Sequence, residues 1–371
     1  MAVTLIESEQ AMQHFIATIE NDLREQPLLA VDTEFFRETT YYPKLGLVQL
    51  ATQNHLACID PLAFDAREGL AQLLLDNGII KLFHSCSQDI EVLQQYLGAP
   101  PCPLLDTQIA AAMLGEQNQV SYAGLVARLL GIELAKSQTR THWLRRPLSH
   151  QQLDYAAEDV LYLIPVYQHL YENLKQQGRL SWLQDDCEQL CRDRQRFEPD
   201  FARCWQRVRG TQKLTPEQLG IVDALAQWRE HRAIQLDKTR RQVLSDDFIV
   251  QAAVQQPDDS HTLRRCGPHT RELSERDFND MLHAMRQARA ADPQSWPQHS
   301  RLHLDSEHKR TVRELMRAIE RKAEELGVAQ ATLGSRKDVE KLLHTQRDST
   351  LLRGWRQRVI GEHLLSLLPQ A

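Results

Sequence analysis

Residues 27–35 place two acidic side chains at the end of an apolar run, and this feature constrains the fold more than any other in the chain. Residues 27–31 read Pro-Leu-Leu-Ala-Val, and Asp32, Thr33 and Glu34 follow directly. A short, continuously apolar run is typical of a strand buried in a sheet. Side chains two residues apart on a strand point to the same face, so Asp32 and Glu34 are expected side by side. A divalent metal ion would relieve their repulsion, and a solvated strand end is the alternative interpretation.

Two later segments carry further polar residues in defined positions. Residues 81–84 read as a short buried strand, and the helix expected after it carries Asp89 in its first turn. Taken alone, an acidic residue at that point is ordinarily a partner of the helix dipole. Farther along the chain, apolar residues recur at helical spacing over residues 152–163. Tyr155 and Asp159 are four apart on this expected helix and therefore share a face.

Together the three segments resemble the three motifs of the DEDD superfamily of 3′→5′ exonucleases, in the branch whose third motif carries a tyrosine. The first motif would be Asp32 with Glu34, the second Asp89, and the third Tyr155 with Asp159. Residues 105–108 and 141–148 resemble the connecting segments of ribonuclease D, and the resemblance covers nearly the whole chain. The sequence is therefore identified as a member of the ribonuclease D family.

The resemblance implies a site for two divalent ions, Mg²⁺ or Mn²⁺, which suit a set of hard oxygen ligands. Asp32, Glu34 and Asp159 would hold one ion near the attacking water, and Asp32 chiefly would hold the second near the leaving group. Asp89 would complete the acidic site, partly through metal-bound water. Tyr155 would orient the attacking water, because an ordinary phenol is a poor general base at neutral pH.

Five further residues are predicted to contact the substrate. Phe35 and His84 flank the expected site and would stack on, or hydrogen-bond to, the terminal nucleotide, with core packing as the alternative. Gln108 is either a substrate-side hydrogen-bonding group or structural. Lys136 and Arg140 belong to a basic stretch before the third motif, together with Arg145 and Arg146. They are expected to meet RNA phosphates, and a solvated basic loop is the competing interpretation.

The formal net charge of −6 hides an asymmetry between the two parts of the chain. Residues 1–205 carry 16 Lys and Arg against 27 Asp and Glu, or −11, whereas residues 206–371 carry 28 against 23, or +5. The acidic excess lies in the part with the expected metal site. The basic excess lies in the remainder, where it would hold the phosphates of RNA, unless it only forms a solvated helical surface.

The patterns predict an α/β domain followed by helical domains. Short apolar runs alternate with helical segments up to about residue 176, and a helix is expected over residues 149–176. By resemblance this is a ribonuclease H-like exonuclease domain, a mixed sheet with flanking helices, over 1–205, with its core at about 3–171 before connecting helices. Two all-α bundles that resemble the helicase-and-RNase-D C-terminal (HRDC) domain would follow at 210–290 and 307–371, joined by a linker at 291–306.

Seven cysteines form an odd set without any Cys-x-x-Cys, which argues against a disulfide framework or a structural zinc site. The longest apolar runs are far shorter than the roughly 20 residues that cross a bilayer, so no membrane association is expected. The beginning of the chain lacks the basic and apolar regions of a secretory signal. A cytoplasmic location is therefore the default expectation, and no obligate protein partner is inferred.

The function that these features predict is a metal-dependent 3′→5′ exoribonuclease. It would remove 5′-mononucleotides from the free 3′ end of RNA, with precursors of tRNA and other small structured RNAs as the substrates that the family resemblance implies. Two alternatives stay open at this point. The same carboxylates serve 3′→5′ exonucleases that act on DNA, and a chain with an inactive site would be a nucleic-acid-binding module only.

Overall fold

The structure is a computed structural model that describes residues 3–116, 119–134, 141–192, 198–298, 306–345 and 349–368. The chain divides into two compact units. The first unit comprises Met1–Phe36, Leu45–Arg194 and His303–Ala371. The second comprises Arg37–Lys44 and Gln195–Leu302. Each unit therefore combines segments that are far apart in the sequence.

A six-stranded mixed sheet forms the centre of the first unit, in the order β1-β4-β3-β2-β5-β6. The strands are β1 (Thr4–Ile6), β2 (Leu28–Phe36), β3 (Lys44–Ala51), β4 (Leu56–Ile59), β5 (Ile80–Phe83) and β6 (Leu104–Asp106). β3 pairs antiparallel with β4, whereas β1 with β4, β2 with β5 and β5 with β6 are parallel pairs. Leu29, Ala30 and Val31 of β2 are fully buried, because a central strand with both faces covered requires apolar residues at every position.

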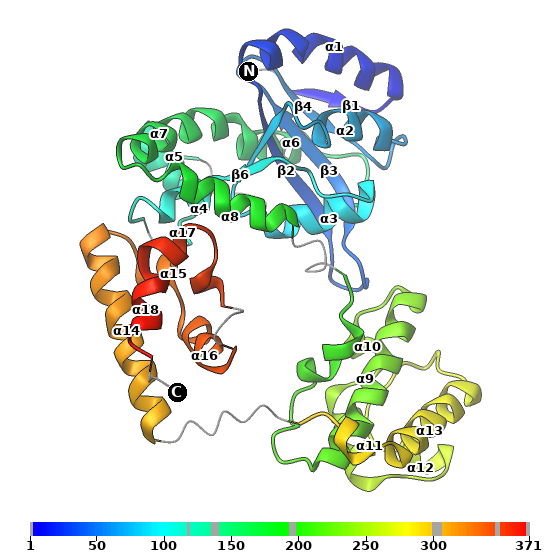
Figure 1. The fold of residues 1–371 in the computed structure, drawn as a ribbon. Coiled ribbons are helices and arrows are strands. Elements are labelled where there is room, and N and C mark those ends of the chain that lie inside the picture. The colour runs from blue at the N-terminus through cyan, green and yellow to red at the C-terminus, as the bar shows by residue number, and fades with distance from the viewer. Residues whose placement is uncertain are drawn as a thin grey trace. The chain divides into compact units, whose positions relative to one another are not determined.

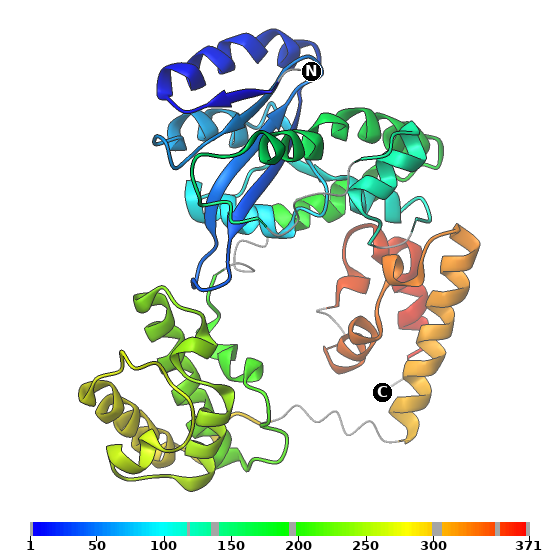
Figure 2. The same ribbon diagram turned by 180° about the vertical axis from the view of Figure 1, so that it is seen from behind.

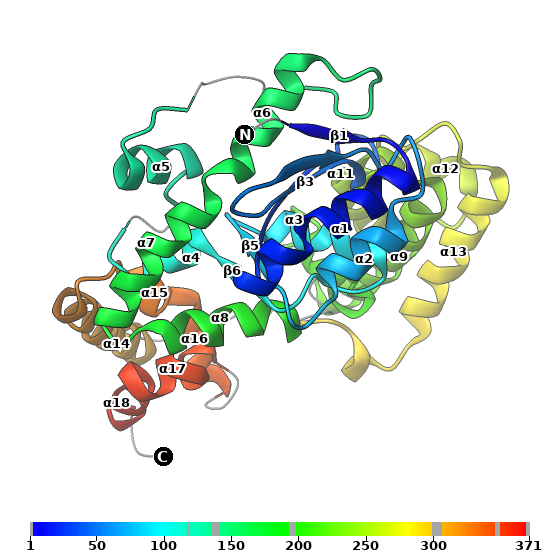
Figure 3. The same cartoon turned by 90° about the horizontal axis from the view of Figure 1, so that it is seen from above.

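Helices cover both faces of this sheet, with α6 on one side and α1, α2 and α3 on the other (Figure 3). In chain order they are α1 (Glu9–Glu25), α2 (Arg67–Leu74), α3 (Ser87–Leu97), α4 (Thr107–Ala112), α5 (Tyr122–Leu130), α6 (His150–Leu161), α7 (Leu163–Gln176) and α8 (Leu180–Arg192). The single helix expected over residues 149–176 is wrong, because the chain breaks at Tyr162 between α6 and α7. Pro165 has no N–H to donate to the carbonyl of Leu161, and this explains the break.

The C-terminal helices complete the first unit (Figure 1). They are α14 (Ser306–Leu326), α15 (Gln330–Leu333), α16 (Arg336–Thr345), α17 (Gly354–Arg356) and α18 (Glu362–Ser366). The indole of Trp355 stacks on that of Trp182 in α8 with 4.3 Å between the ring centroids. Arg179 donates hydrogen bonds to the carbonyls of Met113 (2.6 Å) and Leu326 (2.5 Å). One guanidinium therefore joins the sheet-containing part of the unit to its C-terminal helices. Figure 2 shows the same C-terminal helices from behind, beside α8 and its neighbours.

The second unit is a helical bundle. Its helices are α9 (Pro216–Leu236), α10 (Arg240–Val243), α11 (Asp246–Gln255), α12 (Ser260–Arg264) and α13 (Glu275–Ala290). α9 begins with a capping box between Thr215 and Gln218, and Pro216 occupies its first position. Tyr41, from the segment between β2 and β3, lies in the apolar core of this bundle. The guanidinium of Arg240 lies 4.9 Å from the centre of the Tyr41 ring.

The predicted α/β domain with helical bundles after it is confirmed as a fold class. The predicted boundaries of three consecutive domains stay a prediction. The two compact units group residues by their contacts in space, and such a grouping does not define domain boundaries along the sequence. Among the described residues, none of the helices combines the length and the apolar composition that crossing a bilayer demands.

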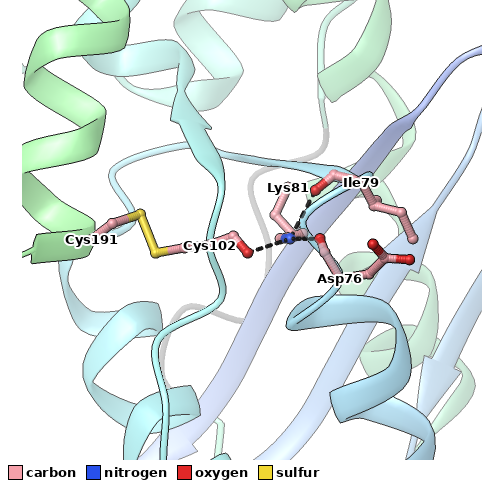
Figure 4. The surroundings of a disulfide bond; sticks show 5 residues. All are labelled: Asp76, Ile79, Lys81, Cys102 and Cys191. Atoms are coloured by element: carbon pink, nitrogen blue, oxygen red, sulfur yellow. Dashed lines mark hydrogen bonds between the residues drawn. A yellow bond between two sulfur atoms is a disulfide. The ribbon is translucent and has the colours of Figure 1, made fainter.

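A disulfide joins Cys102, in the segment before β6, to Cys191 at the end of α8, with 6.0 Å between their Cα atoms (Figure 4). The sequence argument against disulfides is therefore wrong for this pair. Partners 89 positions apart leave no local spacing signal, since only the packing of α8 beside β6 brings them together. Next to this bond, the buried ammonium group of Lys81 donates to the carbonyls of Asp76, Ile79 and Cys102 at 2.7–2.8 Å.

Reduction of this disulfide is expected to lower the free energy of unfolding by up to about 4 kcal/mol, since the bond closes a long loop in the unfolded chain. Urea unfolding of the full chain, with and without a phosphine reductant, measures the change. Cys102→Ser is the control, and its unfolding midpoint should not respond to the reductant. Equal midpoints for the oxidised and reduced natural chain would contradict the expectation.

Candidate active site

Three carboxylates from two elements converge beside the second half of β2. Asp32 and Glu34 share a face of β2, and Asp159 reaches them from α6, which packs against that strand. One carboxylate oxygen of each residue lies within 4.8 Å of those of the other two. A divalent cation at their centre would find hard oxygen ligands only, which is the donor set that Mg²⁺ and Mn²⁺ prefer.

The carboxylates hold protons more strongly than ordinary acidic groups do. Burial, together with the charges of Asp159 and Asp89, raises the pKa of Glu34 to about 8. Burial likewise raises the pKa of Asp159 to about 7, against a hydrogen bond from Tyr155 that lowers it. The pKa of Asp32 is raised well above its usual range by burial and by the charges of Asp89, Asp159 and Glu34. The cluster of carboxylates therefore lacks a compensating positive charge, which a divalent cation would supply.

Asp89 lies beside this group, in the first turn of α3, with 7 % of its surface exposed. Its carboxylate accepts a hydrogen bond of 2.5 Å from the hydroxyl of Thr33, the residue between Asp32 and Glu34. Burial raises the pKa of Asp89 to about 6, and the bond from Thr33 acts in the opposite direction. All four predicted carboxylates are thus neighbours. Asp89 is adjacent to the three converging carboxylates and is tied to the same strand through Thr33.

Tyr155 stands one turn before Asp159 on α6, and the two side chains are hydrogen-bonded. Burial and the charges of Asp159, Glu34 and Asp32 raise the pKa of the Tyr155 phenol. A phenol with a raised pKa keeps its proton at neutral pH, so it can donate and orient but does not serve as a base.

Tyr122 is a neighbour of the site that the sequence analysis missed. Its hydroxyl donates to the carbonyl of Glu158 and accepts from the N–H of Tyr162, both at 3.1 Å. The charges of Asp159 and Asp32 add to burial in raising the pKa of this phenol. The bond to Tyr162 replaces a helical hydrogen bond at the break between α6 and α7. No local pattern around Tyr122 indicates this role, which depends on the packing of α5 against α7 and brings the hydroxyl to the junction of α6 and α7.

The predicted substrate contacts fall into three groups. His84 and Gln108 point toward protein atoms: the two ring nitrogens of His84 face the hydroxyl of Thr107 (2.9 Å) and the carbonyl of Val120 (3.0 Å), and Gln108 donates to the same carbonyl. Phe35 is partly exposed on β2. Lys136 and Arg140 lie outside the described residues.

The neighbouring arginines of the basic stretch also differ. Arg146 is committed to the protein, because it pairs with the buried carboxylate of Asp60 and donates to the carbonyl of Gly46 at 2.7 Å. Arg145 is exposed. Of these two, Arg145 is the one that presents its charge to the solvent side.

Comparison with known proteins agrees with this architecture. The 3′-5′ exonuclease family matches residues 4–175, and the HRDC domain matches residues 218–285. Ribonuclease D of Shewanella sp. (strain ANA-3) is 35% identical over 350 residues, covering 93% of this chain and 89% of that protein. Ribonuclease D of Haemophilus influenzae is 32% identical over 387 residues, covering 99% and 96%.

Solved structures extend the agreement to three dimensions. The crystal structure of Escherichia coli RNase D superimposes with a TM-score of 0.87 at 30% identity, over 100% of both chains. The catalytic core of RRP6 from Trypanosoma brucei, at 22% identity and a TM-score of 0.60 over 77% of this chain and 79% of that one, shares the fold.

The exonuclease sheet with its acidic cluster defines a divalent-metal-dependent 3′→5′ exonuclease. With relatives above 30% identity over nearly the full length, the chain belongs to the ribonuclease D family. It is accordingly a 3′→5′ exoribonuclease, and its substrate is RNA.

Proposed function

We propose that this exoribonuclease trims the free 3′ ends of structured RNA precursors, tRNA precursors foremost, and releases 5′-mononucleotides. The observation that carries the proposal is the convergence of Asp32, Glu34 and Asp159 on one point beside Asp89. Support for the substrate class comes from the similar E. coli enzyme, which is described as an exoribonuclease involved in structured RNA processing.

In this proposal the four carboxylates hold two divalent ions, Mg²⁺ or Mn²⁺. Asp32, Glu34 and Asp159 would bind the first and Asp32 chiefly the second, with Asp89 acting partly through water. When bound, such ions activate water and stabilise the charge of the leaving oxygen in phosphodiester hydrolysis. The protein contributes the positions of the ligands, which are set by the alternation of β2 and by the packing of α6 on it.

Tyr155 orients the attacking water in this mechanism. The phenol is partly exposed beside Asp159 and keeps its proton, so it can donate one hydrogen bond toward a group in front of the carboxylates. Phe35 is the remaining predicted contact that β2 itself supplies for the terminal nucleotide. Lys136 and Arg140 stay predicted contacts to phosphates.

We also infer a cytoplasmic location, where precursor RNAs are available. Thiols are kept reduced in that compartment. The Cys102–Cys191 pair would then exist there as two thiols, and the bond would form on exposure to oxidant.

A time course on 5′-labelled RNA and a DNA of matched sequence tests the function. Each substrate carries a 3′-hydroxyl or a 3′-phosphate, and each reaction contains Mg²⁺, Mn²⁺ or a chelator. Stepwise shortening of RNA from the 3′-hydroxyl, abolished by chelator and blocked by the 3′-phosphate, is expected. A tRNA precursor with a 3′ extension should be shortened to a discrete product.

Each other result has a defined meaning. Faster shortening of DNA would overturn the preference for RNA, and products of internal cleavage would overturn the 3′-end mechanism. Binding of RNA without any product, with both metals present, would identify a nucleic-acid-binding module with an inactive site.

A further inference from the structure

The turn between β5 and α3 carries the chain directly to Asp89, and its backbone is strained. Ser85 in this turn has a φ of 64°, in the left-handed region that L-residues other than glycine avoid. Holding a residue other than glycine in that region costs free energy, so surrounding contacts must fix it. The turn ends at Cys86, whose carbonyl accepts from the N–H of Ile90 as α3 begins.

Asp106 supplies those contacts. It is the last residue of β6, and the parallel pairing of β5 with β6 places it opposite Phe83, just before the turn. Its carboxylate accepts from the backbone N–H groups of Ser85 (3.0 Å) and Cys86 (2.8 Å). Asp106 is 3 % exposed, so these bonds are protected from competing water.

The same carboxylate also caps α4. It accepts from the N–H groups of Gln108 (2.7 Å) and Ile109 (3.3 Å). Thr107 adds a second tie, because its hydroxyl donates to the carbonyl of Phe83 at 3.0 Å. Residues 106 and 107 therefore hold both ends of the strand-to-helix turn against the start of α4.

The position of Asp89 depends on this turn from one side and on β2 from the other. Asp89 follows Cys86 by three residues, within the first turn of α3, so a shift of the turn moves its carboxylate. On the side of β2, the hydroxyl of Thr33 donates a hydrogen bond to the carboxylate of Asp89. The backbone of Thr33 also hydrogen-bonds to this carboxylate, so β2 fixes one side of Asp89 and the turn fixes the start of the helix that carries it.

We propose that Asp106 is a positioning residue of the metal site, which holds the Ser85 turn and thereby the carboxylate of Asp89 next to Asp32. The proposal rests on the metal site proposed above. Partners that orient metal ligands typically change metal affinity about 10–100-fold when they are replaced. A residue that served only as the cap of α4 would change stability and leave metal affinity alone.

The test compares Asp106→Asn with the natural chain, using the full-length protein. Asparagine keeps the volume but turns one accepting oxygen into an NH₂ group, which faces the N–H of Ser85 in one orientation of the amide and that of Cys86 in the other. Binding of Mn²⁺, followed by the loss of the EPR signal of the free ion, is expected to weaken about 10-fold. RNA hydrolysis at subsaturating Mn²⁺ should fall with it and recover in part at high Mn²⁺.

A second substitution tests whether Asp106 acts on Asp89 through the turn at Ser85. Ser85→Gly removes the conformational cost of the left-handed turn, because glycine adopts positive φ freely. In the Asp106→Asn background it is therefore expected to raise Mn²⁺ affinity about threefold or more, because part of the cost of the left-handed conformation is relieved. Asp259→Asn is the matched control, since Asp259 caps α12 in the second unit by accepting from the N–H of Thr262 at 2.9 Å. Its Mn²⁺ affinity should equal that of the natural chain.

The possible failures are distinguishable. A lower melting temperature of Asp106→Asn with unchanged Mn²⁺ affinity in the folded protein would reduce Asp106 to a helix cap and overturn the proposal. Lost affinity that Ser85→Gly does not restore would overturn the route through the turn. If the natural chain itself binds no Mn²⁺, the metal site fails and the positioning role fails with it.

Discussion

Asp32→Asn is expected to abolish RNA hydrolysis while RNA binding persists. Asp32 is the carboxylate whose pKa responds to all three other acids of the site, so it lies where a metal ion would contact the most ligands. Asparagine retains its size and removes its charge. A loss of about 4 kcal/mol of metal-derived transition-state stabilisation corresponds to a rate about 10³-fold lower.

Single-turnover hydrolysis of an end-labelled RNA measures this effect, and a filter-binding titration in chelator measures affinity. Asp154→Asn is the matched control, because Asp154 is an exposed carboxylate on α6 one residue from Tyr155. It should hydrolyse RNA at the natural rate. More than a tenth of the natural rate in Asp32→Asn, or loss of its RNA binding, would contradict the assignment of the site.

The second large effect is a dependence of stability on pH that a divalent metal removes. Glu34 and Asp159 have pKa values of about 8 and 7 in the folded chain, against 4.5 and 3.8 as ordinary values. The folded state therefore binds protons that the unfolded state releases. Their contribution to stability is complete below about pH 4 and is lost as pH rises through 7 and 8. Since one pKa unit corresponds to about 1.4 kcal/mol, a loss of a few kcal/mol is expected.

Thermal unfolding in chelator between pH 5.5 and 8.5 should show the melting temperature falling as pH rises and levelling off above about pH 8, where both groups are deprotonated in the folded chain as well. With Mn²⁺ the fall should disappear or reverse, because deprotonated carboxylates bind the ion. Glu34→Gln in chelator should show a smaller fall, since it removes one of the titrating groups. A melting temperature that rises with pH in chelator would contradict the sign of these pKa shifts.

The carboxylate site could be predicted from sequence because each of its parts has a local signature. The alternation of β2 places Asp32 with Glu34, and helical spacing places Tyr155 with Asp159. That the two pairs meet came from resemblance to a family rather than from the residues. The family and the fold class are confirmed, and the individual site residues stay proposals.

The features that escaped prediction depend on contacts between distant segments. β1 and β6 are three residues long, which is too short for a periodic pattern. Asp106 resembles an ordinary helix cap in the sequence, and only the pairing of β5 with β6 brings it to Ser85. Lys81 interrupts an apolar strand, yet it is fully buried, because three carbonyls from its surroundings receive its ammonium group.

The segment Arg37–Lys44 has a consequence for how the chain can be divided. The hydroxyl of Tyr41 donates to Glu230, its ring lies under Arg240, and Lys44 pairs with Asp237 at 2.8 Å, all within the second unit. These residues nevertheless connect β2, which carries Asp32 and Glu34, to β3. A shortened protein ending before the helical bundle would keep every motif of the exonuclease but lose the groups that cover Tyr41. In this chain the connection between β2 and β3 is therefore covered by helices that follow the exonuclease motifs by more than 50 residues, and a stable shortened protein must retain those helices or replace the loop.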